Sequence, residues 1–186
     1  MQITYVTGNK IKFEIANNVL KGSKIKLVQM NLNTPEIQSI DVRNVAKYSA
    51  LWAREKINRS VVVTDAGFYI NGLNGFPGPY IKYINKWLNT EDILKLLEEK
   101  ENRSICIKDC LVYCSKKGKI KIFENEIRGI ITKKIKCERG PMIDKLVIPE
   151  SLDCTISELT YEESIDFWSR HSNFIKLKNW IERNGE

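Results

Sequence analysis

The run Val61-Val62-Val63 constrains the fold of this chain more than any other feature of its sequence. Three consecutive β-branched residues are typical of a central strand that is buried on both faces, as in α/β proteins. The run stops at Thr64-Asp65, and a loop rich in glycine and proline follows. We therefore expect Asp65 at the end of a central strand, a common place for chemistry in an α/β protein. The alternative is that Asp65 only caps a turn and that the glycines only supply unusual backbone angles.

Length and composition predict one globular domain over residues 1–186. Hydrophobic residues make up 42% of the chain and charged residues 28%, which is ordinary for a globular protein. No apolar run approaches the roughly 18–20 residues that span a bilayer. The N-terminus reaches a strand at once, without the basic and apolar regions of a signal peptide. We therefore expect a cytoplasmic protein that does not interact with membranes.

The cysteines and the net charge indicate which kinds of site and partner to expect. The five cysteines are an odd number without metal-type spacing, and we interpret Cys106, Cys110 and Cys114 as core residues of one strand. The net charge of +7 would suit a polyanion, either nucleic acid or a phosphorylated small molecule. The lysines are scattered and no RNA-binding signature is evident, so we expect no nucleic-acid partner.

Hydrophobic periodicity predicts alternating strands and helices, followed by a hairpin and C-terminal helices. The expected strands are 2–6, 24–30 and 61–63, a hairpin of 104–113 with 119–127, and 130–137 as a further strand or its continuation. The expected helices follow Asn9 up to Leu20, begin near Asp41 or Asn44 and end near Ile57, and cover 80–87 and, after a cap at Thr90, 91–101. A final helix capped by Thr160 is expected to break near Ser169–Asn173 and to continue to about Ile181.

The first strand–turn–helix connection is a candidate anion site. Thr7-Gly8-Asn9 lies between the strand and the helix, and Lys12 follows in the first turn. The unpaired N–H groups and the dipole of a helix start favour negative charge there. A plain strand–helix connection is the alternative. Glu36 follows Pro35 in an expected loop, where its carboxylate either reaches into a cleft or stays in water.

Five motifs follow one another along nearly the whole chain. They are VTGNKIK (Val6–Lys12), TPEIQ (Thr34–Gln38), the segment Val61–Ile84, FENEIRG (Phe123–Gly129) with ERG (Glu138–Gly140), and TISEL (Thr155–Leu159). In this order they resemble the motifs of the inosine triphosphate pyrophosphatases, the Ham1-like enzymes that remove non-standard purine nucleoside triphosphates. The first and third motifs are the most specific.

The resemblance implies both a fold and a reaction. The fold would be α/β, an elongated mixed β-sheet flanked by helices, in two lobes with a central cleft. The reaction would be Mg²⁺-dependent hydrolysis of non-canonical purine (deoxy)nucleoside triphosphates, of the ITP, dITP and XTP type, to monophosphate and pyrophosphate. The resemblance also implies a homodimer.

The same resemblance assigns roles to individual residues. The residues that it places against the triphosphate are Thr7, Gly8, Asn9, Lys12 and Lys47. Glu36 and Asp65 are the carboxylates that it places at the metal, a hard ion that prefers carboxylate and phosphate oxygens. One of these two carboxylates, Asp65 in preference to Glu36, would also orient or deprotonate the attacking water, and Lys12 would stabilise the transferring phosphoryl group.

Three regions depart from the family pattern. Thr64 stands where the family has a second acid, so one contact with a metal-bound water is expected to be absent. In the base-binding segment, Pro141–Lys145, only Asp144 matches and the aromatic stacking partners are missing. The third region is the C-terminal Lys-Asn-x-x-Ser-His-Arg signature, which falls in Glu163–His171 without its lysine.

Two registers are open for this signature. Without gaps, Arg170 takes the arginine position and Ser169 the histidine position. With a shift of one residue, Ser169 takes the serine position and Arg170-His171 follow in reversed order. His171 is the single histidine of the chain. Arg170 and His171 therefore either bind substrate or form a solvated break between helices.

The departures fall on the nucleobase half of the site, so we expect a bound triphosphate tail with changed or relaxed base selection. Two other functions stay open. A diverged paralogue would bind nucleotides, or a protein partner, without turnover. A basic nucleic-acid-binding protein would show steeply salt-dependent binding.

Overall fold

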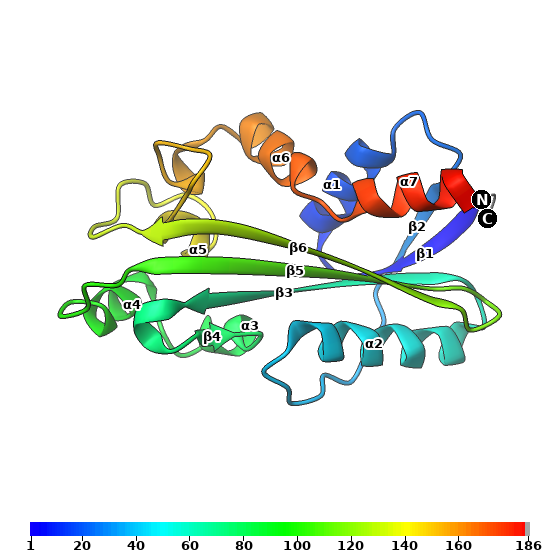
Figure 1. Cartoon of the computed structure of the whole chain (residues 1–186), viewed down its shortest axis with the longest axis horizontal. Helices are drawn as coiled ribbons and strands as arrows, with labels where there is room; N and C mark the ends of the chain where they lie inside the picture. Colours follow the sequence, from blue (N-terminus) through cyan, green and yellow to red (C-terminus); the bar gives the residue numbers. More distant parts are fainter. Residues whose placement is uncertain (185–186) are drawn as a thin grey trace. The chain divides into compact units, whose positions relative to one another are not determined.

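The computed structural model describes residues 1–184 and contains a seven-stranded mixed sheet with helices (Figure 1). The strands are β1 (Gln2–Val6), β2 (Lys26–Met30), β3 (Val61–Ile70), β4 (Phe76–Gly78), β5 (Ser104–Cys114), β6 (Ile120–Ile131) and β7 (Val147–Pro149). The helices are α1 (Lys10–Leu20), α2 (Val42–Ile57), α3 (Ile81–Ile84), α4 (Thr90–Leu96), α5 (Met142–Leu146), α6 (Tyr161–Arg170) and α7 (Phe174–Asn184), with 3₁₀ turns η1 (Asn71–Leu73) and η2 (Ile156–Glu158). The strand order is β2-β1-β3-β5-β6-β7, with β4 paired to β3 outside this path. β1 is parallel to β2 and β3, and β4 and β7 pair antiparallel to β3 and β6, so the α/β mixed sheet is confirmed.

The chain forms two compact units, and the long strands β3, β5 and β6 contribute residues to both. Unit 1 consists of residues 1–65, residues 109–125 and the chain from residue 165 onward. Unit 2 consists of residues 66–108 and 126–164. A single domain over residues 1–186 remains a prediction.

Helices cover both faces of the sheet in unit 1 (Figure 1). Side chains of a strand alternate between faces, so Val61 and Val63 belong to one buried cluster and Val62 to the other. We call the first the α2 face, because fully buried alanines of α2 pack there: Ala46, Ala50 and Ala53. We call the second the α1/α7 face, because these helices pack there against large side chains: Tyr5, Tyr113, Phe123, Phe174 and Leu177.

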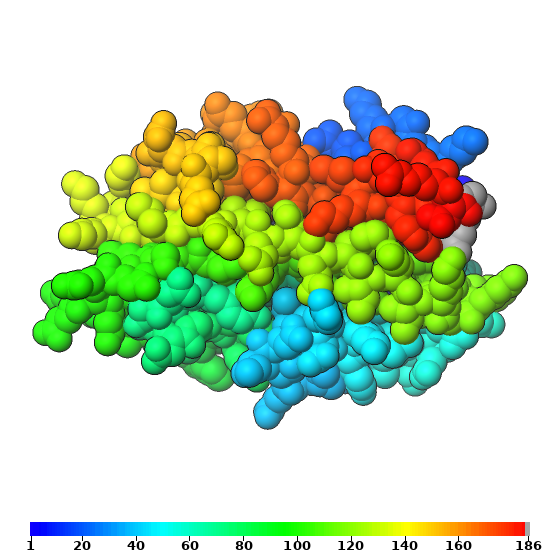
Figure 2. Space-filling view, in the orientation of Figure 1, coloured from blue at the N-terminus to red at the C-terminus, as the bar shows by residue number. Residues whose placement is uncertain are grey.

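Helix α7 also lies beside strand β6, and Figure 2 shows the red surface of the helix next to the yellow-green surface of the strand. The rings of Phe123 and Trp180 meet with centroids 6.2 Å apart. The Lys176 amine donates to the backbone carbonyl of Glu124. The C-terminal helix is thus fixed to unit 1 by both aromatic and polar contacts.

Unit 2 is held together around Arg103, which lies at the start of β5. Its guanidinium donates to the carbonyl oxygens of Leu97 (2.8 Å), Ile131 (3.0 Å) and Thr132 (2.7 Å). The first of these follows α4 and the other two lie at the end of β6. One side chain therefore joins the end of α4 to the end of β6 through three backbone carbonyl groups.

The structure corrects several predicted boundaries. Strand β3 does not stop at Thr64-Asp65 but continues to Ile70, so Asp65 lies inside the strand. Strand β6 passes through Gly129 without interruption, because this glycine lies against β7, where an added Cβ would come within 2.5 Å of the Ile148 carbonyl oxygen. The predicted strand 130–137 therefore ends at Ile131.

The predicted ends of helix α4 are wrong, and those of helix α6 are confirmed. The cap of α4 is Asn89, one residue before the expected Thr90, and the helix ends at Leu96. The capping box of Thr160 with Glu163 is confirmed, since each accepts a hydrogen bond from the other's backbone N–H. The expected break is also confirmed, because α6 ends at Arg170 and α7 begins at Phe174.

The five cysteines are free thiols. Cys110 and Cys114 are buried in the core, as predicted, whereas the prediction was wrong for Cys106, which is only partly buried. Within residues 1–184, no helix is long and apolar enough to cross a membrane.

Candidate active site

The start of α1 brings four predicted site residues together. Asn9 is the N-cap, and its side-chain oxygen accepts from the backbone N–H groups of Ile11 (2.9 Å) and Lys12 (3.1 Å). The backbone N–H of Asn9 in turn donates to the Thr7 hydroxyl. Gly8 lies so close to Asn31 that an added Cβ would come within 2.9 Å of its side-chain oxygen. The side chain of Asn9 is therefore already hydrogen-bonded to two of the backbone N–H groups that we expected to bind an anion.

Lys12 is half-buried at this helix start, and its positive charge influences the pKa of a carboxyl group that the sequence did not single out. Burial raises the pKa of Asp109, and the positive charge of Lys12 is the strongest opposing influence. Asp109 lies on β5, and the alternation of β5 places it on the α1/α7 face, since Leu111 and Tyr113 belong to that cluster.

Asp65 lies on the opposite face of the sheet. It follows Val61 and Val63 at the spacing of two residues that keeps side chains on one face, here the α2 face. Burial raises the pKa of the Cys110 thiol to about 12, and the charge of Asp65 adds to this effect, in agreement with a position near that buried cysteine. Asp65 is half-buried. It also falls on β3 between the residues that pair with β1 and those that pair with β4.

Thr64, the neighbour of Asp65, is turned to the α1/α7 face. Its hydroxyl hydrogen-bonds to that of the buried Tyr5, with 2.5 Å between the oxygens. Thr64 therefore occupies the position where the resemblance implies a second acid, and its hydroxyl is hydrogen-bonded to Tyr5.

Helix α2 presents two cations one turn apart, Arg43 and Lys47. Lys47 is exposed. Arg43 lies in the first turn and donates from both arms of its guanidinium to the carboxylate of Glu124. Arg43 and Glu124 also act on the Cys110 thiol, so they lie in the same neighbourhood as Asp65. Glu36 is exposed in the loop between β2 and α2.

The donor chemistry of Glu36 and Asp65 fits a hard cation. Carboxylate oxygens suit Mg²⁺, which commonly binds one or two carboxylates and completes its shell with phosphate oxygens and water. In the described part of the chain, no group of three or more His, Cys, Asp or Glu side chains is arranged to hold a metal ion. A metal held by Glu36 and Asp65 would complete its shell with oxygens of water or of a phosphate.

Asp144, the predicted base-binding acid, lies in unit 2 at the start of α5. Burial raises the pKa of this carboxyl to about 6. Gly140, with a φ of +80°, lies against it, and an added Cβ would come within 3.7 Å of the carboxylate. The positive φ is a conformation that glycine adopts without strain, so this turn suits the glycine present.

The predicted C-terminal residues already have partners within unit 1. Arg170 pairs with Asp166 four residues earlier in α6. The His171 ring packs on Phe167, with centroids 4.6 Å apart, and its Nδ1 lies 2.8 Å from the Phe167 carbonyl oxygen. Because a carbonyl can only accept, Nδ1 carries the proton in this contact. Both residues thus stabilise the end of α6 in this structure.

Ser169, the third residue of that signature, is buried and accepts a hydrogen bond from the Asn18 side chain at 3.0 Å. It therefore joins α6 to α1. Neither of the two registers is favoured by this contact.

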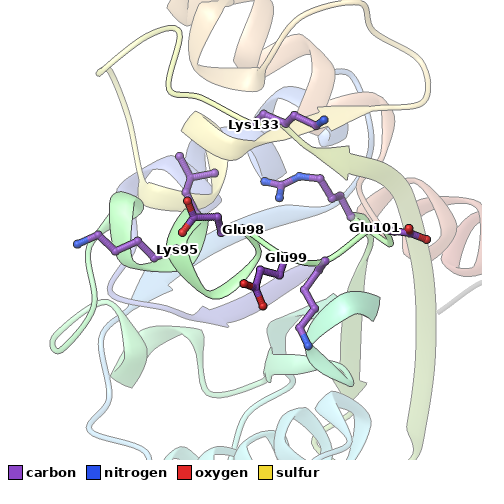
Figure 3. A pocket seen from close by; sticks show the side chains of 8 residues that line it. Lys95, Glu98, Glu99, Glu101 and Lys133 are labelled. Atoms are coloured by element: carbon purple, nitrogen blue, oxygen red, sulfur yellow. The ribbon is translucent and has the colours of Figure 1, made fainter.

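A pocket of about 580 Å³ lies in unit 2, away from the predicted residues in sequence. Figure 3 shows acidic and basic side chains around it, including Glu98, Glu99, Lys95 and Lys133. No residue predicted from the sequence lines it, and its mixed charges give it no preference for an anion.

Sequence reasoning missed Arg43 and Asp109. Arg43 lies in the first turn of α2, where a charged residue is commonplace. Asp109 was the detectable one, because it is the one acid in the alternating set of β5 whose other members are apolar: Ile105, Ile107, Leu111 and Tyr113.

Comparison with known proteins supports the predicted family over nearly the whole chain. A protein of Methanopyrus kandleri named dITP/XTP pyrophosphatase is 35% identical over 184 residues, covering 99% of this chain and 98% of that protein. One of the same name from Hyperthermus butylicus is 33% identical over 183 residues, covering 98% and 96%. The solved structure of a HAM1 protein from Coxiella burnetii has a TM-score of 0.85 at 18% identity, covering 98% of this chain and 99% of the other. The Staphylococcus aureus Ham1 protein gives 0.83 at 19% identity, covering 98% of each chain.

At these low identities the two structures support the fold alone, while the sequence relatives support the family. The model of the Ham1 family matches residues 3–180, which include the five motifs. The chain therefore belongs to the Ham1 family.

Proposed function

We propose that this protein is a nucleoside triphosphate diphosphatase that hydrolyses non-canonical purine nucleoside triphosphates to monophosphate and pyrophosphate. The observation that carries the proposal is the 35% identity, over 99% of the chain, to a protein named dITP/XTP pyrophosphatase. The chain keeps the chemistry that such a reaction needs, with a lysine at the start of α1 and a carboxylate on β3.

In the proposed reaction, one water adds across the bond between the α- and β-phosphates. Thr7, Gly8 and Asn9 bind the triphosphate at the start of α1, and Lys12 and Lys47 balance its negative charge. Asp65 orients the attacking water and accepts its proton. The family implies a divalent metal in general, and we propose Mg²⁺, held by Glu36 and Asp65, which neutralises phosphate charge and makes water more acidic.

We further propose that Asp144 selects the base, with Arg170 and His171 as the other candidates for substrate contact. Above about pH 6 Asp144 is a carboxylate and can only accept a hydrogen bond. Hypoxanthine and xanthine carry a hydrogen on N1, whereas adenine has an acceptor there. An ionised Asp144 therefore favours the first two bases. Arg170 must leave Asp166 to take part.

The test of the reaction is pyrophosphate release from a panel of nucleoside triphosphates with Mg²⁺. We expect release from dITP and XTP, slower release from dATP, and loss of all release when EDTA removes the metal. If none of the substrates yields pyrophosphate while calorimetry still detects nucleotide binding, the protein is the diverged paralogue and the enzymatic proposal fails.

The role of Asp144 has its own pH test. Because burial raises the pKa to about 6, the carboxylate is lost as the pH falls through 6 rather than near the usual 3.8. The preference for dITP over dATP should therefore decline between pH 7 and pH 5. Asp144→Asn should show a weak preference at every pH. A preference that stays constant in the unmodified protein would exclude Asp144 as the selecting group.

We propose in addition that the chain works as a single domain and assembles as a homodimer, and that it acts in the cytoplasm. Light scattering coupled to size-exclusion chromatography tests the dimer, since a monomer of 21.6 kDa is easily distinguished from a mass twice as large.

A further inference from the structure

The side chain of Gln29 is hydrogen-bonded to the loop of residues 7–9, and the proposed reaction gives this glutamine no role. Gln29 lies half-buried on β2, at the edge of the sheet, and its register partner on the parallel strand β1 is Tyr5. The Gln29 side-chain NH₂ donates to the Thr7 carbonyl oxygen at 3.1 Å and, over a longer 3.5 Å, to that of Asn9. An edge strand therefore holds the loop that we propose binds the triphosphate.

The two carbonyl groups depend on Gln29 to different degrees. The Asn9 carbonyl oxygen also accepts from the backbone N–H of Phe13 at 3.2 Å, so the first turn of α1 orients it in any case. Within residues 1–184 the Thr7 carbonyl oxygen has Gln29 as its one hydrogen-bond partner. Because Gly8 and Asn9 are exposed, water can reach this loop, and the need to satisfy a buried acceptor does not explain the Gln29 contact.

The direction of each carbonyl group fixes the direction of the N–H group that follows it. In a planar trans peptide unit the C=O and N–H bonds point to opposite sides. The Thr7 carbonyl oxygen points to Gln29, so the Gly8 N–H points away from Gln29. The Asn9 carbonyl oxygen lies near the same NH₂ group, so the Lys10 N–H points away as well. No hydrogen bond within residues 1–184 uses either N–H group, and two donors on one side of a loop suit the oxygens of an anion.

The peptide unit between Thr7 and Gly8 needs a partner because the chain itself does not restrain it. Turning this unit over changes the φ of Gly8, and glycine adopts positive and negative φ about equally well. The turned unit would present a carbonyl oxygen to the anion in place of an N–H group. The Thr7 N–H donates to the Met30 carbonyl oxygen at 3.0 Å, and the Thr7 hydroxyl accepts from Asn9. Neither contact involves this peptide unit.

We propose that Gln29 is a positioning residue, which holds the Thr7 carbonyl group and thereby directs the Gly8 N–H toward the phosphates. The Lys10 N–H points to the same side of the loop. This inference rests on the proposed function for the identity of the anion. Gln29 acts from the opposite side of the loop and does not touch the phosphates. A donor that is fixed before the anion arrives needs no ordering on binding, so Gln29 strengthens the binding of the triphosphate tail.

The positioning can be measured without any ligand, through the residual dipolar coupling of the Gly8 N–H, which reports the average direction of that bond. Gln29→Met keeps the length of the side chain but removes the donor. We expect the coupling to lose about half of its magnitude in this variant, because the peptide unit then samples both directions. Gln2→Met is the matched control, since Gln2 is exposed at the start of β1, and it should leave the coupling unchanged. Circular dichroism establishes that each variant is folded. An unchanged Gly8 coupling in folded Gln29→Met would overturn the proposal.

Binding of inorganic tripolyphosphate in the presence of Mg²⁺, measured by calorimetry, connects the position of the N–H to the anion. Gln29→Met should bind tripolyphosphate about tenfold more weakly than the unmodified protein, because the Gly8 donor is no longer fixed. Gln2→Met should bind it as tightly as the unmodified protein does. Equal affinity in Gln29→Met, or no binding to the unmodified protein, would contradict the proposed role of Gln29.

Kinetics then separate positioning from a structural role. With dITP, Gln29→Met should raise KM about tenfold with kcat within about threefold, because the N–H groups hold the phosphates in the ground state as well as in the transition state. A purely structural role would instead lower kcat through the loss of folded protein and leave KM unchanged. Absence of turnover in the unmodified protein contradicts the proposed function, while the dipolar coupling and the binding of tripolyphosphate still decide the role of Gln29.

Discussion

The two faces of the sheet in unit 1 are covered by side chains of different size and type. On the α2 face, helix α2 packs through alanines onto valines and cysteines, so helix and sheet approach closely. On the α1/α7 face, the contact is made by rings, with Tyr5, Phe123 and Phe174 in the buried layer. Two side-chain hydrogen bonds, Tyr5–Thr64 and Asn173–Asp109, lie in the second layer. Large side chains of irregular shape leave places there where a hydroxyl or an amide can be held.

This difference separates two neighbours on β3. Thr64 belongs to the α1/α7 face and binds Tyr5, whereas Asp65 belongs to the α2 face with Arg43 and Glu124 nearby. The side chain of Thr64, next to Asp65 in sequence, therefore lies on the other face of the sheet.

The largest effect is expected for Asp65→Asn. The amide keeps the shape of the carboxylate but cannot accept a proton from water, so kcat should fall about 10³-fold. The melting temperature should stay close to that of the unmodified protein. The matched control is Asp153→Asn, an exposed aspartate outside the proposed site, which should leave pyrophosphate release unchanged. Turnover that survives in Asp65→Asn would remove Asp65 from the reaction.

The second prediction concerns the close packing of the α2 face. Burial raises the pKa of Cys110 from 9.0 to about 12, so the reactive thiolate at pH 8 should be about 10³-fold scarcer than for an ordinary thiol. The sign follows from burial, which disfavours the charged form. We expect Cys110 to resist alkylation until the protein unfolds. Cys137, whose pKa is lowered by its contact with Arg139, should react first. Rapid labelling of native Cys110 would mean that the α2 face is open.

The third prediction compares a helix residue from each face. Leu177→Ala should leave a cavity among the rings of the α1/α7 face and lower the free energy of unfolding by about 2–5 kcal/mol. Ala50→Leu should force α2 away from the sheet at a cost of about 1–3 kcal/mol. Urea unfolding measures both. If the larger side chain at position 50 were tolerated without cost, the alanine contact would not be tight.

Much of this architecture could be predicted from local patterns. The valine run located β3, alternation located β5 and β6, and Thr160 with Glu163 marked the start of α6. The predictions that were wrong concern the ends of strands and helices. The strand signal in β3 weakens after Val63 because Asp65, Ala66 and Gly67 have low strand propensity. Pairing with neighbouring strands, among them β4, extends the strand to Ile70.

The structure around the candidate site residues was predictable where it depends on a continuous segment, and it was not predictable where it depends on contacts between distant residues. The start of α1 is one continuous segment, so its residues could be read together. Arg170 and His171 were also predicted as candidates for substrate binding. In the structure, Arg170 pairs with Asp166 and His171 contacts Phe167. The sequence did not predict these contacts, because the point at which the helix breaks could not be located to one residue. Asp109 and Asn173 are 64 residues apart, and no local pattern brings such a pair together.

The smallest effect is expected at Thr64, and it completes the comparison with Asp65. Thr64→Val keeps the shape of the side chain but leaves the buried Tyr5 hydroxyl without its partner, at a cost of about 1–3 kcal/mol of unfolding free energy. Tyr5→Phe removes that hydroxyl, so the double variant should recover part of the loss because no polar group is then left alone. Turnover should stay within about threefold in all three proteins, since a neutral hydroxyl bound inside the protein contributes far less to the reaction than a general base does. A loss of turnover in Thr64→Val comparable to that in Asp65→Asn, without a matching loss of stability, would show that the two faces of β3 act as one site.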